Sequence, residues 1–115
     1  MNFIGSFFGE PVPTVSVQDL EGKLKGGNLL FLLDVREPEE FRLGHIAGAK
    51  LIPLGELDRR IKEVPRDREI ACICASGNRS VTAAQILKAA GLTASSVKNG
   101  MIGWQMAGLP IIKGM

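Results

Sequence analysis

The sequence has no tyrosine, and aromatic residues of all kinds make up only 5% of its 115 residues. It contains one histidine, His45, and two cysteines, so it lacks the His and Cys ligands of a structural zinc site. Basic residues exceed acidic ones by only two, which gives no indication of a nucleic-acid-binding surface. No apolar run approaches the roughly 18 residues of a membrane-spanning helix, and no glycine-rich nucleotide-binding motif is present. We therefore expect no metal, no cofactor, no nucleic-acid partner and no membrane span.

The two cysteines, Cys72 and Cys74, are separated by one residue within a predicted strand. Residues at this spacing on a strand point to the same face but lie too far apart for an unstrained disulfide. The chain is therefore not expected to be a disulfide-stabilised scaffold. Free thiols favour a reducing compartment, so we expect a cytoplasmic location.

The chain length fits a single domain with one hydrophobic core. Hydrophobic residues make up 45% of the chain and charged residues 23%, which is ordinary for a globular protein. Residues 1–9 are apolar and uncharged, and they either cover an edge of the core or contact a partner or a membrane. We favour the first interpretation, and we expect residues 10–115 to form the single domain.

Hydrophobic periodicity predicts strands that alternate with helices along the chain. Ser16 followed by Asp19 is typical of a helix start, and Gly26-Gly27 is typical of its end. The apolar runs 29–35 and 69–74 predict buried parallel strands, because neither run alternates with polar residues. Further predicted elements are short helices at 38–43, 54–61 and 101–106, a longer helix at 79–90, and short strands at 49–54 and 94–97. This alternation predicts an α/β fold whose central, mostly parallel sheet is flanked by helices on both faces.

The segment from Cys74 to Ser80 combines the features of a reactive cysteine. Cys74 ends an apolar strand at the sheet edge where α/β proteins bind ligands, and a predicted helix follows the loop. Loop N–H groups, the positive helix N-terminus and the Arg79 guanidinium would all favour a thiolate. Cys72 instead lies inside the apolar run and is interpreted as a buried core residue. The predicted sulfur- or anion-binding loop consists of Ala75, Ser76, Gly77, Asn78, Arg79 and Ser80.

Four separate motifs give the chain a resemblance to a known family. They are Asp34-Val35-Arg36-Glu37-Pro38 with Glu40-Phe41, Gly44 to Ala49 with Ile52-Pro53-Leu54, Cys74 to Ser80, and Gly100-Met101 with Trp104 and Gly108-Leu109-Pro110. In this order, from about residue 15 to residue 110, they resemble a single-domain rhodanese. Asn99 departs from the family pattern, which commonly has a glycine at this position. Asparagine tolerates left-handed backbone conformations, so we expect the turn to survive.

The resemblance implies a three-layer rhodanese-like fold and a sulfurtransferase activity. The Cys74 thiolate would attack the outer sulfur of a small donor, thiosulfate or a persulfide, and hold that sulfur as a Cys74 persulfide. Cyanide or a thiol would then accept the sulfur, and a protein could also serve as donor or acceptor. Cys74 is therefore the predicted catalytic residue.

Two other functions compete with this interpretation. A non-catalytic rhodanese-like module for binding or regulation usually lacks the cysteine, whereas this chain has both Cys74 and Arg79. A cysteine phosphatase or arsenate reductase has five residues between its cysteine and its arginine, and here only four intervene. The smaller loop suits one sulfur atom better than a tetrahedral phosphate.

Three polar residues lie in the motifs outside the cysteine loop. Asp34 and Arg36 either support the pocket or form a structural ion pair with each other or with the second motif. His45 is more typical of a hydrogen-bonded loop anchor than of a general base. We favour the structural interpretation for all three, and we interpret Trp104 as a core or pocket-wall aromatic residue.

Overall fold

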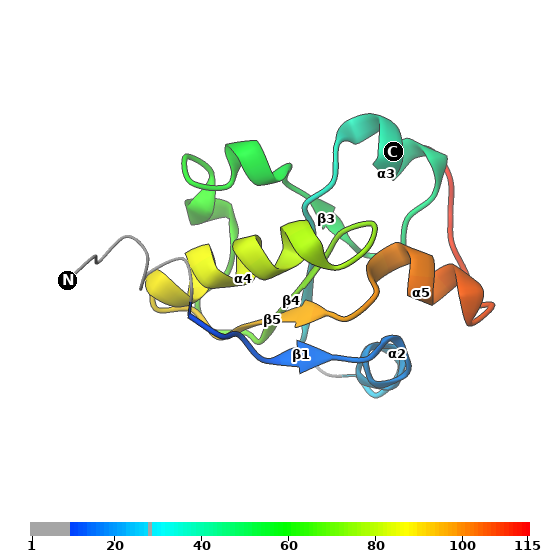
Figure 1. The fold of residues 1–115 in the computed structure, drawn as a ribbon, viewed down its shortest axis with the longest axis horizontal. Helices are drawn as coiled ribbons and strands as arrows, with labels where there is room; N and C mark the ends of the chain where they lie inside the picture. The colour runs from blue at the N-terminus through cyan, green and yellow to red at the C-terminus, as the bar shows by residue number, and fades with distance from the viewer. Residues whose placement is uncertain (1–9, 28) are drawn as a thin grey trace.

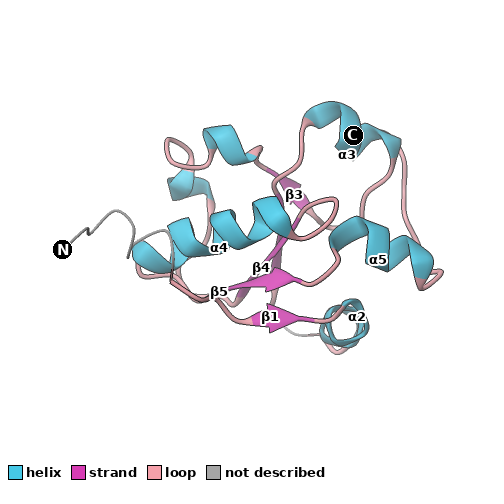
Figure 2. Cartoon of the chain, viewed as in Figure 1, coloured by secondary structure: helices cyan, strands magenta, loops and turns pink. Residues whose placement is uncertain are grey.

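The computed structural model describes residues 10–27 and 29–115, and the apolar segment predicted at 1–9 lies outside them. Five strands of the described residues form one sheet in the order β1-β5-β4-β2-β3, and every pair of neighbours is parallel. The strands are β1 (Thr14–Val15), β2 (Phe31–Asp34), β3 (Lys50–Leu51), β4 (Ile70–Ile73) and β5 (Ala94–Val97). The sheet forms the middle layer between helices, as Figure 2 shows. The predicted α/β fold with a central parallel sheet is confirmed.

Helices cover both faces of this sheet (Figure 1). The described helices are α2 (Val17–Lys25), α3 (Pro38–Leu43), α4 (Asn78–Ala89) and α5 (Gly100–Met106). One hydrophobic core joins α4 to the sheet and includes Ala84, Leu87 and Cys72. The other core joins α2 and α5 to the opposite face through Leu20 and Trp104. Burial on both faces explains why the central strands read as continuous apolar runs.

The order of the strands places three connecting loops at one edge of the sheet. β2, β4 and β5 are neighbours and run in parallel, so their carboxyl ends meet at this edge. Asp34 ends β2, Cys74 follows β4, and the turn at Asn99 follows β5. Ligands of open α/β sheets bind at this edge, so the fold itself brings the predicted motifs together.

Two local predictions differ from the structure. The helix predicted at 54–61 is wrong: the chain forms two separate 3₁₀ turns, η1 (Leu54–Glu56) and η2 (Ile61–Glu63). The backbone of Arg60, with φ −112° and ψ 16°, departs from helical values and separates the two turns. The two-residue strand β1 was not predicted, because it pairs with β5 through its backbone and is too short to show a hydrophobic period.

None of the helices in the described ranges is long and apolar enough to cross a lipid bilayer.

The start of α2 follows the sequence prediction, because the Ser16 side chain accepts a hydrogen bond from the Asp19 N–H at 3.0 Å. This bond satisfies one of the backbone donors that a helix leaves unpaired at its first turn.

We expect Ser16→Ala to lower the free energy of unfolding by about 1 kcal/mol, because the first turn of α2 loses its cap. Chemical denaturation with the slope held common to both proteins measures the change. Ser16→Asp is the control, since aspartate also caps helices and should keep nearly the parental stability. Equal destabilisation by both substitutions would contradict the assignment of the cap.

Candidate active site

The sulfur of Cys74 is surrounded by hydrogen-bond donors from the loop that follows β4. The N–H groups of Gly77 and Ser80 lie 3.2 Å and 3.3 Å from the sulfur. The Ser80 hydroxyl lies 3.5 Å from the sulfur and 2.7 Å from the hydroxyl of Ser96 on β5. When Cys74 is ionised, Ser80 donates to the sulfur and Ser96 donates to Ser80. The loop therefore presents an array of donors to a sulfur anion.

The backbone conformation of Gly77 allows the loop to close around the sulfur. Its φ of 106° lies in the left-handed region, which a residue with a side chain rarely adopts. α4 begins at the next residue, so its first free N–H groups and its positive end are directed at Cys74. The sequence predicted this strand–loop–helix arrangement, with a helix start that differs by one residue.

The helix α5 also contacts the loop that follows Cys74, through backbone hydrogen bonds. The N–H groups of Met101 and Ile102, at the start of α5, donate to the carbonyl oxygens of Cys74 and Ala75 at 2.8 Å and 3.0 Å. Gly100 makes this approach feasible, because a Cβ there would overlap both carbonyl oxygens. Asn99 has a φ of 65°, so the turn tolerates asparagine as the sequence predicted.

The surroundings of the two cysteines shift their pKa values in opposite directions. Burial raises the pKa of Cys74, but hydrogen bonds from the Ser80 hydroxyl and from loop N–H groups outweigh it, and the pKa is lowered. Burial raises the pKa of the Cys72 thiol well above its usual range, and the neighbouring Cys74 adds to that effect. Cys74 is itself 0% exposed, so the loop covers the sulfur instead of leaving it open to solvent.

The Arg79 guanidinium is engaged by a carboxylate on α3. Its two terminal nitrogens donate to the two carboxylate oxygens of Glu40 at 2.8 Å and 2.9 Å. This hydrogen-bonded pair raises the pKa of Arg79, and the charge of Cys74 contributes less. The sequence predicted that the Arg79 guanidinium favours the Cys74 thiolate, and the structure adds a carboxylate partner, Glu40, that the sequence did not predict.

The structure places Asp34 and Arg36 in a buried ion pair. The guanidinium donates to both Asp34 oxygens, with the shortest contact at 2.8 Å, and to the Gly44 carbonyl oxygen at 2.8 Å. Asp34 is 0% exposed and Arg36 is 5% exposed. The pair therefore ties the end of β2 to the loop after α3.

His45 lies in the same loop and is also buried. Its Nδ1 is 2.8 Å from the Phe41 carbonyl oxygen, and its ring stacks on the Phe41 ring with the centroids 3.6 Å apart. Its backbone forms a two-residue bridge with Ile112. These contacts are those of a loop anchor that connects α3 to the C-terminal segment.

The remaining loop side chains differ in exposure. Ser76 and Asn78 are exposed, and Ala75 is half-buried. Ser76 lines a cavity together with Asn99, Ile102, Gly103 and Met106. This cavity lies beside the cysteine loop, on the side of α5.

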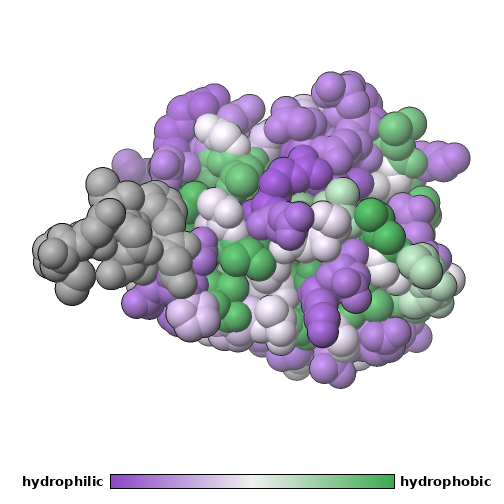
Figure 3. All heavy atoms as spheres, in the orientation of Figure 1, coloured by the Kyte–Doolittle hydropathy of each residue, from purple (hydrophilic) through white to green (hydrophobic). Residues whose placement is uncertain are grey.

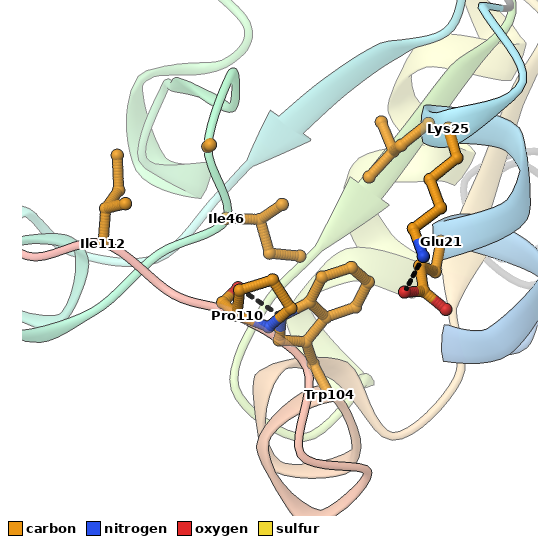
Figure 4. A pocket seen from close by; sticks show the side chains of 8 residues that line it. Glu21, Lys25, Ile46, Trp104, Pro110 and Ile112 are labelled. Carbon is orange, nitrogen blue, oxygen red and sulfur yellow. Dashed lines mark hydrogen bonds and ion pairs between the residues drawn. The ribbon is translucent and has the colours of Figure 1, made fainter.

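Trp104 lines a different cavity, which Figure 4 shows from close by. Its indole N–H donates to the Pro110 carbonyl oxygen at 2.9 Å, and its ring faces Ile46. The cavity lies between α2, α5 and the C-terminal segment, and no residue of 74–80 lines it. Trp104 is thus both a core residue and a pocket wall, but it lies outside the cysteine loop.

Within residues 10–27 and 29–115, no group of three His, Cys, Asp or Glu side chains is placed to hold a metal ion.

Sequence reasoning missed Ser96, Glu40 and the backbone of α5 as parts of the site. Ser96 could have been suspected as a polar residue in a predicted buried strand. Glu40 belonged to a quoted motif, but its pairing with Arg79 is a tertiary contact between residues 39 positions apart.

Comparison with known proteins agrees with this fold. A family model described as a rhodanese-like domain matches residues 16–107, so the chain belongs to the rhodanese-like domain family. A protein of Allochromatium vinosum named sulfurtransferase is 31% identical over 102 residues, which are 88% of this chain and 95% of that protein. The crystal structure of a rhodanese-related protein from Thermoplasma volcanium has a TM-score of 0.82 and 37% identity, and covers 87% of this chain and 97% of its own.

Other relatives are longer than this chain. YrkF of Bacillus subtilis, whose name proposes a sulfur-carrier role, is 39% identical over 94 residues, or 81% of this chain. The match covers 51% of YrkF, and 47% of a Mycobacterium tuberculosis transcriptional regulator that is 34% identical. The chain therefore spans about half the length of these two relatives.

We expect Gly100→Ala to lower the free energy of unfolding by about 2–4 kcal/mol, because the new Cβ would meet backbone oxygens that cannot move independently. Gly22→Ala is the matched control. Gly22 lies in α2, and a Cβ at this position would meet no neighbouring residue within 4 Å, so alanine fits there. The control should gain about 0.5–1 kcal/mol, because alanine favours helices over glycine. Similar unfolding curves for the two variants would contradict the proposed contact.

We expect limiting iodoacetamide to modify Cys74 before Cys72. The thiolate is the reacting form, and a lowered pKa makes it abundant at a lower pH, whereas the raised pKa of Cys72 keeps it protonated. The rate at Cys74 should therefore reach its plateau at a lower pH than the rate of a free cysteine. Peptide mass mapping across a pH series measures both sites in one chain. Faster labelling of Cys72 would reverse the assignment.

Proposed function

We propose that this chain is a rhodanese-type sulfurtransferase that carries sulfane sulfur as a persulfide on Cys74. The observation that carries the proposal is the set of donors around the Cys74 sulfur from Gly77 and Ser80, which lowers the pKa of the thiol. An activated thiolate at the carboxyl edge of a parallel sheet is suited to nucleophilic catalysis. The donor is a small sulfane compound such as thiosulfate or a persulfide, and the acceptor is a thiol or cyanide.

The first step transfers one sulfur atom from thiosulfate. The Cys74 thiolate attacks the outer sulfur, a new S–S bond forms, and the S–S bond of thiosulfate breaks with its electron pair leaving on sulfite. In the second step, cyanide or a thiolate attacks the outer persulfide sulfur, and the electron pair of the broken S–S bond returns to Cys74. The negative charge lies on the Cys74 sulfur before transfer and on the outer persulfide sulfur afterwards, and it returns to Cys74 when the acceptor takes that sulfur. The fixed N–H donors around Cys74 therefore stabilise the thiolate that begins and ends the cycle.

Several features support this function over the alternatives. A binding module needs no activated thiol, yet Ser80 and Ser96 form a buried hydroxyl relay that ends at the sulfur. The four residues between Cys74 and Arg79 form a smaller loop than that of a cysteine phosphatase. Both cysteines are free in the structure, and a persulfide carrier works in a reducing compartment such as the cytoplasm. We assign the activity to a single domain of residues 10–115, and a protein could also act as sulfur donor or acceptor.

We expect Cys74→Ser to abolish transfer from thiosulfate to cyanide, because serine cannot carry a persulfide. Cys72→Ser is the matched control: it should retain transfer and lose about 1–3 kcal/mol of stability through a buried hydroxyl without a partner. Thiosulfate should add about 32 Da, the mass of one sulfur atom, to the parent and to Cys72→Ser only. Loss of transfer in a folded Cys72→Ser protein, or Cys74-dependent release of phosphate from an aryl phosphate, would overturn the proposal.

A further inference from the structure

The only basic residue of the loop from 74 to 80 does not offer a free positive charge. Arg79 and Glu40 form a two-pronged ion pair, and each side chain is 36% exposed. A guanidinium in this geometry satisfies both oxygens of one carboxylate, so the pair has almost no net charge. An anion that approaches the loop from this side meets a neutral pair.

Glu40 is held in place independently of Arg79. The Glu37 N–H donates to one of its carboxylate oxygens at 2.9 Å. Its backbone carbonyl oxygen accepts from Arg36 at 3.3 Å, so the buried Asp34–Arg36 pair anchors this turn of α3. The hydrogen bonds from Arg79 lower the pKa of Glu40 to about 2, so the carboxylate stays ionised at neutral pH. The neutralisation of Arg79 is therefore a fixed property of the fold.

The other side of the loop is apolar. Ile102 and Met106 are 54% and 84% exposed, and both line the cavity that Ser76 joins. Figure 3 shows hydrophobic surface in the region of α5, bordered by hydrophilic residues. No charged residue lines this cavity. Lys98 lines the neighbouring cavity, and Asn99, Gly103 and Met106 line both. The surface beside the loop thus suits a donor with an apolar body.

The charge of the sulfur donor determines how strongly the Cys74 thiolate repels it when no free positive charge in the loop compensates. Attack by a thiolate on thiosulfate brings one negative charge against two, whereas attack on an arylthiosulfonate brings one against one. Both reactions give the Cys74 persulfide, and the electron pair leaves on sulfite or on the arylsulfinate. Coulomb repulsion in the attacking complex grows with the product of the charges, so a loop whose one basic side chain is already paired penalises the dianion most.

We propose that this site prefers sulfane donors of low charge with an apolar body over the thiosulfate dianion, and that Glu40 sets this preference by neutralising Arg79. This inference rests on the proposed persulfide chemistry of Cys74. Glu40 is a positioning residue that acts through Arg79, and Met106 contributes contact to the apolar body of the donor.

The test compares sodium thiosulfate with sodium benzenethiosulfonate, each with cyanide as acceptor. The parent protein should show the higher kcat/KM with benzenethiosulfonate. Glu40→Gln frees the charge of Arg79 and should raise kcat/KM for thiosulfate about tenfold, mainly through a lower KM, because Coulomb attraction acts on the bound dianion. The gain for the monoanion should be about threefold, and both gains should shrink in high salt.

Glu39→Gln is the matched control, since Glu39 lies next to Glu40 on α3 and is exposed, whereas the hydrogen bonds and the ion pair of Arg79 are made to Glu40. It removes the same formal charge and should leave both donors near parental rates. Arg79→Gln should act in the opposite direction and lower kcat/KM for thiosulfate more than for benzenethiosulfonate. This second variant keeps the proposal testable if Glu40→Gln fails to fold.

Met106→Thr should reduce the preference for benzenethiosulfonate about threefold, because it removes an apolar contact. Met115→Thr is its control, because Met115 is also exposed and lines neither cavity beside α5. Equal use of both donors by the parent, or equal effects of Glu40→Gln and Glu39→Gln on thiosulfate, would overturn the inference. Failure of every donor to add sulfur to Cys74 would instead reject the proposed function, and with it this inference.

Discussion

The site depends on one backbone contact between two segments that follow adjacent strands. The first turn of α5 donates two N–H groups to the carbonyl oxygens of Cys74 and Ala75, and this contact requires the absence of a side chain at Gly100. With these carbonyl oxygens turned towards α5, the N–H groups later in the loop are free to face the sulfur. The hydrogen bonds that lower the pKa of Cys74 are therefore a consequence of how β5 and α5 meet β4.

Burial and activation of Cys74 would normally oppose each other. A buried thiol resists ionisation, as the neighbouring Cys72 illustrates, and Cys74 is just as inaccessible to solvent. The difference between them is local: Cys74 lies past the end of β4, where the loop and Ser80 replace water as hydrogen-bond donors. The low dielectric around the sulfur then strengthens each of these bonds. Burial becomes useful because it excludes water from an anion that the protein already solvates.

Most of the fold and the position of Cys74 just past the end of a strand could be predicted from the sequence, because they depend on local patterns. Apolar runs predicted β2 and β4. Ser16 indicated the start of α2, because its side chain caps the helix, and Gly77 indicated the tight loop before α4, because glycine adopts a left-handed backbone. The pairing of Arg79 with Glu40 could not be predicted, since it requires α3 and α4 to approach in space. The short strand β1 and the 3₁₀ turns also escaped prediction, because two or three residues carry no measurable period.

The site contains two ion pairs that differ in burial: one is buried, and the other is partly exposed at the surface. Asp34 and Arg36 are buried, so each compensates the desolvation of the other, and together they position the backbone of α3. The partly exposed Arg79 and Glu40 pair contributes little to stability by comparison, because solvent screens it. A pair of this kind is free to serve another purpose. In the proposed donor preference, this pair sets the net charge that an incoming donor meets beside the Cys74 sulfur.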